Sequence, residues 1–196
     1  LHANFRQAGA SELQDIEPAH WRRKARAVLD TLTGDAAGAL RVTDTSPMNF
    51  LYIGAIAIML PAARVVYCCR DAMDNCLSIY RQFLTGPHGY AHELADLGGF
   101  YKLHVQLTEH WLRALPGQIH VLNYDRLVAD PEAQIRSLLD FCQLPFERQC
   151  LSFHDSGRMV RSPSASQVHQ PIYTSSVGAW RNYEQHLAPL KEALGL

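Results

Sequence analysis

Hydrophobic residues alternate along this chain between short continuous runs and longer stretches with helical spacing. The runs predict buried strands at 64–69 and 119–122, and a third, shorter strand at 40–43 that ends at Asp44. Helical stretches separate these runs, and strands that alternate with helices usually pair in parallel. We therefore expect an α/β fold in which a parallel sheet is flanked by helices on both faces.

The apolar residues at helical spacing also give approximate bounds for the helices. Helices are predicted at about 18–33, 49–60, 72–84, 93–115, 130–142 and 176–194. Pro61 stops the second of them, because a proline inside a helix removes a hydrogen bond. Asp130 and Pro131 open the fifth as N-cap and first helical residue. Pro189 interrupts the last.

An irregular segment rich in Ser, Gln and Pro occupies about 154–175. Within compact domains, irregular segments of this length are usually functional or disordered. Val168, Ile172 and Tyr173 give it side chains that can pack, while its hydroxyls and backbone amides are suited to an anion site. A plain surface loop is the other interpretation of this composition.

The overall composition limits the classes of protein to which the chain can belong. Its 196 residues are enough for one domain, 1–196, and 47% hydrophobic with 19% charged residues is typical of a soluble globular protein. The formal net charge of −1 argues against nucleic acid and against a membrane surface as partners, since both bind basic proteins. The scattered basic residues are better suited to a local anion pocket.

The cysteines indicate a reducing compartment, and we expect a cytoplasmic protein. They are odd in number, and two of them are adjacent in a predicted strand: Cys68, Cys69, Cys76, Cys142 and Cys150. None forms a paired ligand set, so we predict neither disulfides nor a bound metal. The longest apolar run, 50–63, is too short and too rich in Gly and Ala to span a bilayer.

Arg70 is the most informative candidate for a binding residue. It comes directly after the buried run 64–69, and a helical pattern then begins that includes Ser78 about two turns later. A guanidinium between a strand end and a helix N-terminus is well placed to hold a phosphate. In open α/β sheets, ligands bind beyond the carboxyl ends of the strands. An arginine that caps the strand and pairs with Asp71 or Asp74 is an equally good interpretation of this corner alone.

Five ordered motifs together resemble the PAPS-dependent sulfotransferase family (PAPS is 3′-phosphoadenylyl sulfate), in particular its bacterial branch similar to protein-tyrosine sulfotransferases. The matching stretches are VTDTSPMNF at 42–50, RDAMDNCLS at 70–78, YDRLV at 124–128, QVHQPIY at 167–173 and SSVGAWRNY at 175–183. They lie in the order and at the spacing of the family. The resemblance implies a P-loop-NTPase-like sulfotransferase fold and sulfuryl transfer from PAPS to an acceptor hydroxyl or amine by in-line displacement.

The family's turn for the 5′-phosphosulfate, with an Arg-Ser-Gly-Thr-like sequence, is absent from this chain. The residues from His2 onward resemble the stretch that comes after this turn in the family. We therefore expect an N-terminally truncated, partial domain that lacks the first strand and the 5′-phosphosulfate loop. The first residue is Leu1, which agrees with a piece of a longer protein.

The resemblance also assigns binding residues. It implies that Arg70 and Ser78 hold the 3′-phosphate of PAPS, and that Tyr124 lies near the adenine; a core tyrosine at a strand end is the alternative for Tyr124. The segment 164–168 is implied in binding the nucleotide and the sulfuryl group, through Ser164, Ser166, Gln167 and Val168.

The same resemblance implies two catalytic roles. Glu12 occupies the place of the proposed general base on the acceptor hydroxyl, which requires a pKa raised by burial; an exposed glutamate at a helix start is the alternative. Ser164 would help to hold the sulfuryl oxygens. The acceptor would be a small molecule or a protein, no metal is implied, and the oligomeric state is not indicated.

Three positions depart from the family pattern, and each departure removes an expected cation. Thr45 replaces a lysine, His169 an arginine and Ala179 a basic residue. Cations near the leaving phosphate stabilise the transition state of transfer, and Arg181, Arg161 or protonated His169 could replace them. Without such a replacement, a non-catalytic domain that binds nucleotide or a partner protein is the alternative. A P-loop phosphotransferase is disfavoured, because the sequence has no Gly-x-x-x-x-Gly-Lys-Ser/Thr loop.

Overall fold

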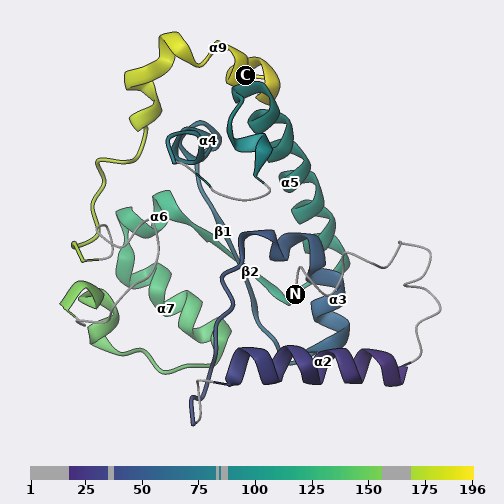
Figure 1. The fold of residues 1–196 in the computed structure, drawn as a ribbon. Coiled ribbons are helices and arrows are strands. Elements are labelled where there is room, and N and C mark those ends of the chain that lie inside the picture. The colour runs from purple at the N-terminus through teal and green to yellow at the C-terminus, as the bar shows by residue number, and fades with distance from the viewer. Residues whose placement is uncertain (1–17, 35–37, 83, 85–87, 156–168) are drawn as a thin grey trace.

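Two parallel strands form the sheet of this protein. The computed structural model describes residues 18–34, 38–82, 84, 88–155 and 169–196. Within these residues, β1 (Val65–Cys69) pairs with β2 (Ile119–Asn123), with Val65 opposite Ile119 and Cys69 opposite Asn123 (Figure 1). The strands predicted at 64–69 and 119–122 are thus confirmed, with the parallel pairing.

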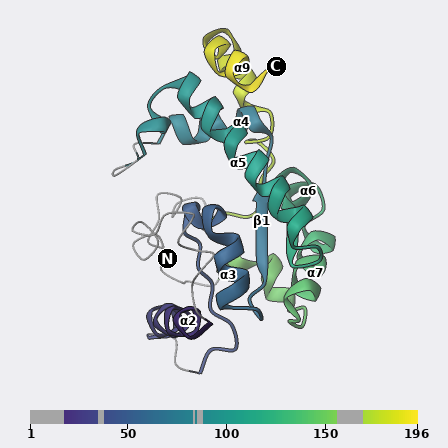
Figure 2. The same ribbon diagram turned by 90° about the vertical axis from the view of Figure 1, so that its right-hand side faces the viewer.

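Helices cover both faces of this sheet, as the alternation of elements predicted. On one face, the ring of Tyr67 lies 5.5 Å from that of His104, on α5 (Leu94–Ala114). On the other face, His120 stacks at 5.2 Å on Phe141 of α7 (Pro131–Cys142). In side view, β1 stands between α3 on one side and α6 with α7 on the other (Figure 2).

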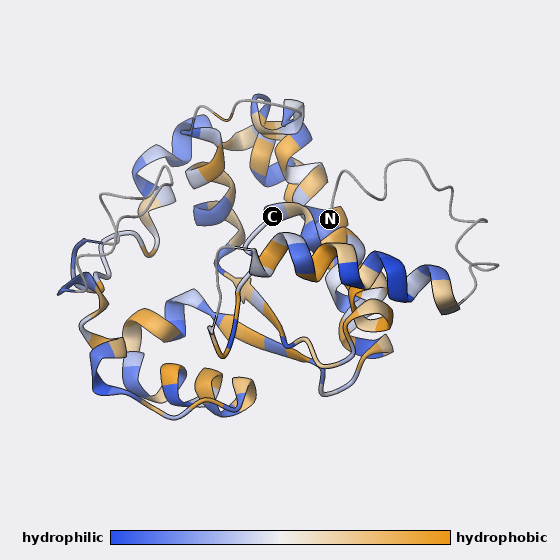
Figure 3. Ribbon diagram, turned by 60° about the horizontal axis from the view of Figure 1, so that its bottom comes forward, coloured by the Kyte–Doolittle hydropathy of each residue, from blue (hydrophilic) through white to orange (hydrophobic). Residues whose placement is uncertain are grey.

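The first described helix, α2 (Pro18–Thr33), has the predicted bounds. It is amphipathic: Ala25 and Val28 are buried, and Arg22, Arg23 and Arg26 are exposed, so hydrophobic and hydrophilic residues alternate along it (Figure 3). The helix predicted at 49–60 forms in two parts, a 3₁₀ helix η1 (Pro47–Tyr52) and then α3 (Ile53–Met59).

The strand predicted at 40–43 is wrong. These residues have no regular secondary structure, and the side chain of Leu40 is 85% exposed. A strand of four residues is stable only when a neighbouring strand takes up its hydrogen bonds, and no described strand pairs with this segment.

The helix after β1 is shorter than its hydrophobic pattern indicated. It is α4 (Ala72–Tyr80), which ends four residues before the predicted Leu84. The amide of Gln82 donates to the carbonyl of Ile79, three residues earlier. Such tighter bonds are common where an α-helix closes.

Helix bounds in the second half of the chain agree with the prediction in part. α5 and α7 form where they were expected, but a six-residue helix, α6 (Tyr124–Ala129), was not predicted. The helix predicted at 176–194 is divided into a 3₁₀ helix η5 (Ala179–His186) and α9 (Ala188–Leu194). Pro189 stands in the first turn of α9, where a proline needs no amide hydrogen bond. Three short 3₁₀ turns complete the described elements: η2 (Gly89–Ala91), η3 (Arg148–Leu151) and η4 (Phe153–Asp155).

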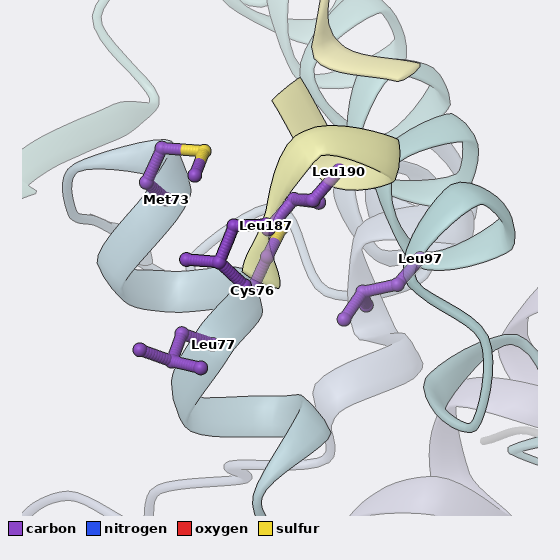
Figure 4. Close-up of a cluster of buried hydrophobic side chains, with 6 residues drawn as sticks. All are labelled: Met73, Cys76, Leu77, Leu97, Leu187 and Leu190. Atoms are coloured by element: carbon purple, nitrogen blue, oxygen red, sulfur yellow. The ribbon is translucent and has the colours of Figure 1, made fainter. Parts of the chain in front are cut away.

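The main hydrophobic cluster joins α4, α5 and the C-terminal helices. Its buried members are Met73, Cys76, Leu77, Leu97, Leu187 and Leu190 (Figure 4). α5 and α9 approach closely at Gly98, because a Cβ there would lie 2.6 Å from the Cβ of Ala193. This cluster fixes α4, and therefore the corner at its N-terminus, against the end of the chain. Among the described helices, none combines the length and hydrophobicity that crossing a membrane requires.

Candidate functional site

The candidate site lies at the corner between β1 and α4. β1 ends at Cys69, and Asp71 caps α4 by accepting the amide of Asp74 at 2.9 Å. Aspartate is a preferred N-cap because its carboxylate binds an amide that the helix leaves unpaired. Arg70 is therefore held between a strand end and a helix N-terminus, as the sequence predicted.

The guanidinium of Arg70 makes three contacts, and one of its buried donors has no partner among the described residues. Its Nη2 donates to the carbonyl of Ser176 and lies 3.7 Å from Oδ2 of Asp74, and its central carbon stands 4.9 Å from the ring centre of Tyr124. Of the two carboxylates that the sequence left open, Asp74 is thus its ion-pair partner. Its Nε is buried and has no hydrogen-bond partner among the described residues. A buried unpaired donor of this kind is rare, and it points to a ligand with acceptor oxygens.

Tyr124 reaches this corner because of the strand register. Cys69 is paired with Asn123, so the next residue of each strand, Arg70 and Tyr124, leaves the sheet at the same level. The hydroxyl of Tyr124 lies 2.9 Å from the hydroxyl of Ser176. Tyr124 thus lies at the corner, beside Arg70.

Asp125, the residue after Tyr124, adds a second polar atom without a partner. Its Oδ2 accepts the amide of Asp71 at 3.3 Å, while its Oδ1 is buried and unpaired within the described part of the chain. The corner therefore offers one buried donor, on Arg70, and one buried acceptor.

Asp74 links the corner to the C-terminal part of the chain. Its side chain is 1% exposed, and its oxygens accept the amides of Gly178 at 2.6 Å and Trp180 at 3.0 Å. Gly178 has φ = 71°, a conformation that favours glycine. From the sequence, Asp74 was only a possible partner of Arg70. Its position in the first turn of the helix that begins just after Arg70 was the available signal.

Ser78 lies on α4, and Arg181 lies on η5, which packs against α4. Ser78 is half-buried and lies four residues after Asp74, so it shares the face of α4 from which Asp74 projects. Arg181 is exposed, and its guanidinium stands 4.9 Å from the ring centre of Trp180. Neither side chain is among the contacts of the Arg70 guanidinium with Ser176, Asp74 and Tyr124.

The three positions that lack an expected cation are also described. Thr45 and His169 are exposed, and Ala179 is the first residue of η5, beside Gly178. The remaining predicted site residues lie outside the described residues, namely Glu12, Arg161, Ser164, Ser166, Gln167 and Val168.

Aromatic side chains support the corner from the side of α5. The hydroxyl of Tyr101 donates to the carbonyl of Arg70 at 3.3 Å. Burial and the neighbouring Tyr67 raise the pKa of Tyr101 to about 12, so this hydroxyl keeps its proton at neutral pH. His104 lies 4.7 Å from Phe50, and burial lowers the pKa of its imidazole.

The described residues contain no group of three or more metal-binding side chains close enough to hold an ion. All five cysteines carry free thiols. The chemistry available at the corner is that of a guanidinium, a phenol, the hydroxyl of Ser176 and the carboxylates of Asp71, Asp74 and Asp125. Guanidinium and hydroxyl donors suit a phosphate group, and an aromatic ring beside them suits the face of a base.

Comparison with known proteins places the chain among proteins of one family. The family model described as "Sulfotransferase family" matches residues 2–148. An uncharacterized protein from Aquifex aeolicus is 41% identical over 157 residues, which are 79% of this chain and 21% of that protein. Cytosolic sulfotransferase 4 of Arabidopsis thaliana is 27% identical, covering 61% of this chain and 41% of that protein. A putative protein-tyrosine sulfotransferase of Caenorhabditis elegans is 28% identical, covering 72% of this chain and 57% of that protein.

A solved structure has the same fold. The sulfotransferase domain from the curacin biosynthetic pathway superposes with a TM-score of 0.59 at 19% identity, covering 80% of this chain and 60% of that one. At this identity the likeness shows the fold alone. The chain spans between about a fifth and somewhat more than half of the length of these relatives.

Proposed function

The chain belongs to the sulfotransferase family, and from that premise we propose that it transfers a sulfuryl group from PAPS to an acceptor hydroxyl or amine by in-line displacement. PAPS would supply an activated sulfuryl group and leave as adenosine 3′,5′-bisphosphate. The observation that carries the proposal is the buried, unpaired Nε of Arg70 at the carboxyl end of β1. An oxygen of a dianionic phosphate would give this donor the acceptor that it lacks.

Within this proposal, the described residues bind the nucleotide. Arg70 and Ser78 hold the 3′-phosphate, one with a charged donor and the other with a neutral hydroxyl. The ring of Tyr124 lies beside the guanidinium of Arg70, 4.9 Å from its central carbon, and would lie against the adenine. Arg181, three residues after Gly178, would supply a cation to the same region.

The catalytic roles rest on the resemblance. Glu12 would take the proton from the acceptor hydroxyl, and Ser164 would hold the sulfuryl oxygens. Ser166, Gln167 and Val168 would complete the nucleotide site. No step in this scheme requires a metal.

The acceptor would be a small molecule or a protein side chain. The name of one relative, a putative protein-tyrosine sulfotransferase, corresponds to the second possibility. We also propose a cytoplasmic location, neither nucleic acid nor membrane as partner, and one partial domain over residues 1–196.

The test is a pair of calorimetric titrations of the full-length protein. Adenosine 3′,5′-bisphosphate is expected to bind, whereas adenosine 5′-monophosphate, which lacks the 3′-phosphate, is expected to bind at least about tenfold more weakly, because it leaves the guanidinium unpaired. Equal affinity for both nucleotides, or no binding, would refute the assignment of Arg70.

A transfer assay then separates the enzyme from a binding protein. Radiolabelled PAPS is incubated with a simple phenol and with a tyrosine peptide, and labelled product is counted. Nucleotide binding without any transfer would favour the non-catalytic alternative, which the missing cations at Thr45, His169 and Ala179 suggest.

A further inference from the structure

We propose that Asp74 is a positioning residue that makes phosphate binding by Arg70 depend on the C-terminal segment 176–180. The inference rests on the proposed function, since it concerns the same phosphate site. It adds that the site is completed only when this segment is held against α4. Asp74 itself touches no ligand in this scheme.

The first observation is that both oxygens of the buried Asp74 carboxylate accept hydrogen bonds. Its side chain is 1% exposed, and its oxygens accept two amides from the segment, those of Gly178 and Trp180. A buried carboxylate is costly unless hydrogen bonds and a cation compensate it. Both kinds of partner are present here, and the hydrogen-bond donors lie 104 and 106 residues away in sequence.

The second observation is that Asp74 acts on Arg70 by two routes. Its Oδ2 lies 3.7 Å from Nη2 of Arg70, which is an ion pair without a close hydrogen bond. The hydrogen bond of Nη2 goes instead to the carbonyl of Ser176. Ser176 lies in the segment whose turn Asp74 binds. Releasing the segment would therefore free the Asp74 carboxylate to move away from Arg70. It would also remove the Ser176 carbonyl that orients the guanidinium.

The third observation concerns Tyr124, which the same segment also contacts. Its hydroxyl lies 2.9 Å from the hydroxyl of Ser176. The segment thus contacts both Arg70 and Tyr124, the residues that directly follow the two paired strands. A shift of 176–180 would loosen the guanidinium and the neighbouring ring together.

Charge alone predicts the opposite effect, and this makes the proposal testable. A carboxylate close to Arg70 repels a bound phosphate, so removing its charge without moving Arg70 would tighten binding. If Asp74 instead positions Arg70, then Asp74→Asn weakens binding. Asparagine has nearly the same shape, but its amide nitrogen presents a donor where the aspartate oxygens accept two amides.

The experiment compares Asp74→Asn with the matched control Asp71→Asn. Both remove one negative charge at the same corner, but the carboxylate of Asp71 accepts an amide of its own helix, and asparagine is an equally good N-cap. We expect Asp74→Asn to bind adenosine 3′,5′-bisphosphate about tenfold more weakly, as the loss of a charge-assisted hydrogen bond would give. Asp71→Asn should stay within about twofold of wild type, because its cap is retained.

A second readout separates positioning from a structural role. A carboxylate that only stabilised the fold would lower the Tm of the free and of the nucleotide-bound protein equally. We expect the nucleotide-induced rise in Tm to shrink in Asp74→Asn, because binding to the folded state sets that rise. An unchanged affinity and an unchanged rise in folded Asp74→Asn would overturn the inference. If the wild type itself does not bind the nucleotide, the proposed function fails instead.

Gly178→Ala tests the coupling from the other end and without a change of charge. Its φ of 71° disfavours alanine, and the new Cβ would clash with Nη1 of Arg181. We expect Gly178→Ala to weaken nucleotide binding in an Arg181→Ala background as well, where neither the clash nor the cation of Arg181 contributes. Should Asp74→Asn fail to fold, this comparison decides: equal binding by Arg181→Ala with and without Gly178→Ala would overturn the inference.

Discussion

The two strands of the sheet end in the same local structure, but the helices that follow them differ in how many of their residues are buried. After β1, Asp71 caps α4 with a bond of 2.9 Å to the amide of Asp74; after β2, Asn123 caps α6 with a bond of 2.9 Å to the amide of Arg126. Each strand thus delivers its chain into a helix through a polar N-cap. In chemical terms the two connections are nearly interchangeable.

They differ in the packing beneath and beside them. α4 buries Met73, Cys76 and Leu77 in the main hydrophobic cluster and Asp74 against the C-terminal segment. α6 has one buried residue, Val128. A strand end alone therefore does not make a binding site. The corner after β1 differs because long-range packing surrounds an arginine with groups that fix it.

The largest effect is expected from removing the packing beneath the first corner. Leu190→Ala should lower the free energy of unfolding by about 2–5 kcal/mol, because the side chain is fully buried and leaves a cavity. Val128→Ala, under the second corner, should cost about 1–2 kcal/mol, since it removes fewer buried carbons. Urea unfolding followed by circular dichroism measures both. Equal losses would mean that the packing beneath each corner contributes equally to the free energy of unfolding.

Removing the arginine should affect binding more than stability. Arg70→Ala is expected to weaken binding of adenosine 3′,5′-bisphosphate about 100-fold, because charge-assisted hydrogen bonds are lost. The matched control is Arg126→Ala, which removes an exposed arginine from the second corner and should change the affinity by less than about twofold. Calorimetry at one salt concentration compares them. Similar losses in both variants would contradict a specific role of the first corner.

The caps should test whether the two connections are locally equivalent. Asp71→Ala and Asn123→Ala should each cost about 1 kcal/mol of unfolding free energy, the usual effect of losing an N-cap. Thermal unfolding at equal protein concentration is sufficient to measure them. A much larger loss for one variant would show that its cap has a role beyond its own helix.

The smallest effect should come from the pH dependence of stability that His104, on α5, gives to the protein. Burial lowers the pKa of His104. Between pH values of about 7.5 and 5.5 the unfolded chain therefore takes up a proton at this residue more readily than the folded one, and stability falls as pH falls. His104→Gln should lose less stability than wild type over this interval, as measured by Tm at both values. Identical slopes would indicate that His104 does not titrate differently on folding.

Much of the local structure could be predicted from sequence because local rules determine it. The bounds of α2, the N-cap of α7 by Asp130 and the strand before Arg70 agree with hydrophobic periodicity, capping residues and proline positions. The strand predicted at 40–43 failed because a run of apolar residues does not show whether a pairing partner exists. α6 was missed because six residues are too few for a helical period to be recognised.

The candidate site could be predicted only in part, for a similar reason. Arg70 was identified from its position between strand and helix, and Tyr124 from the resemblance. The bonds of Asp74 to Gly178 and Trp180 could not be predicted, because they join residues more than a hundred positions apart. Pairing with Asp74 rather than Asp71 depends on the same folding of the chain end onto α4.

The pairing of Cys69 with Asn123 has a consequence for how this region can change in sequence. Adjacent residues of a strand face opposite sides, so a slip of one residue between the strands would turn every side chain to the other face. A single insertion before Arg70 or before Tyr124 would thus separate the guanidinium from the ring, whichever residue were inserted. Substitutions within β1 and β2 should be tolerated more readily than any change in their lengths. The strands then serve as a fixed spacing for two polar residues, and under the proposed function their length matters for nucleotide binding.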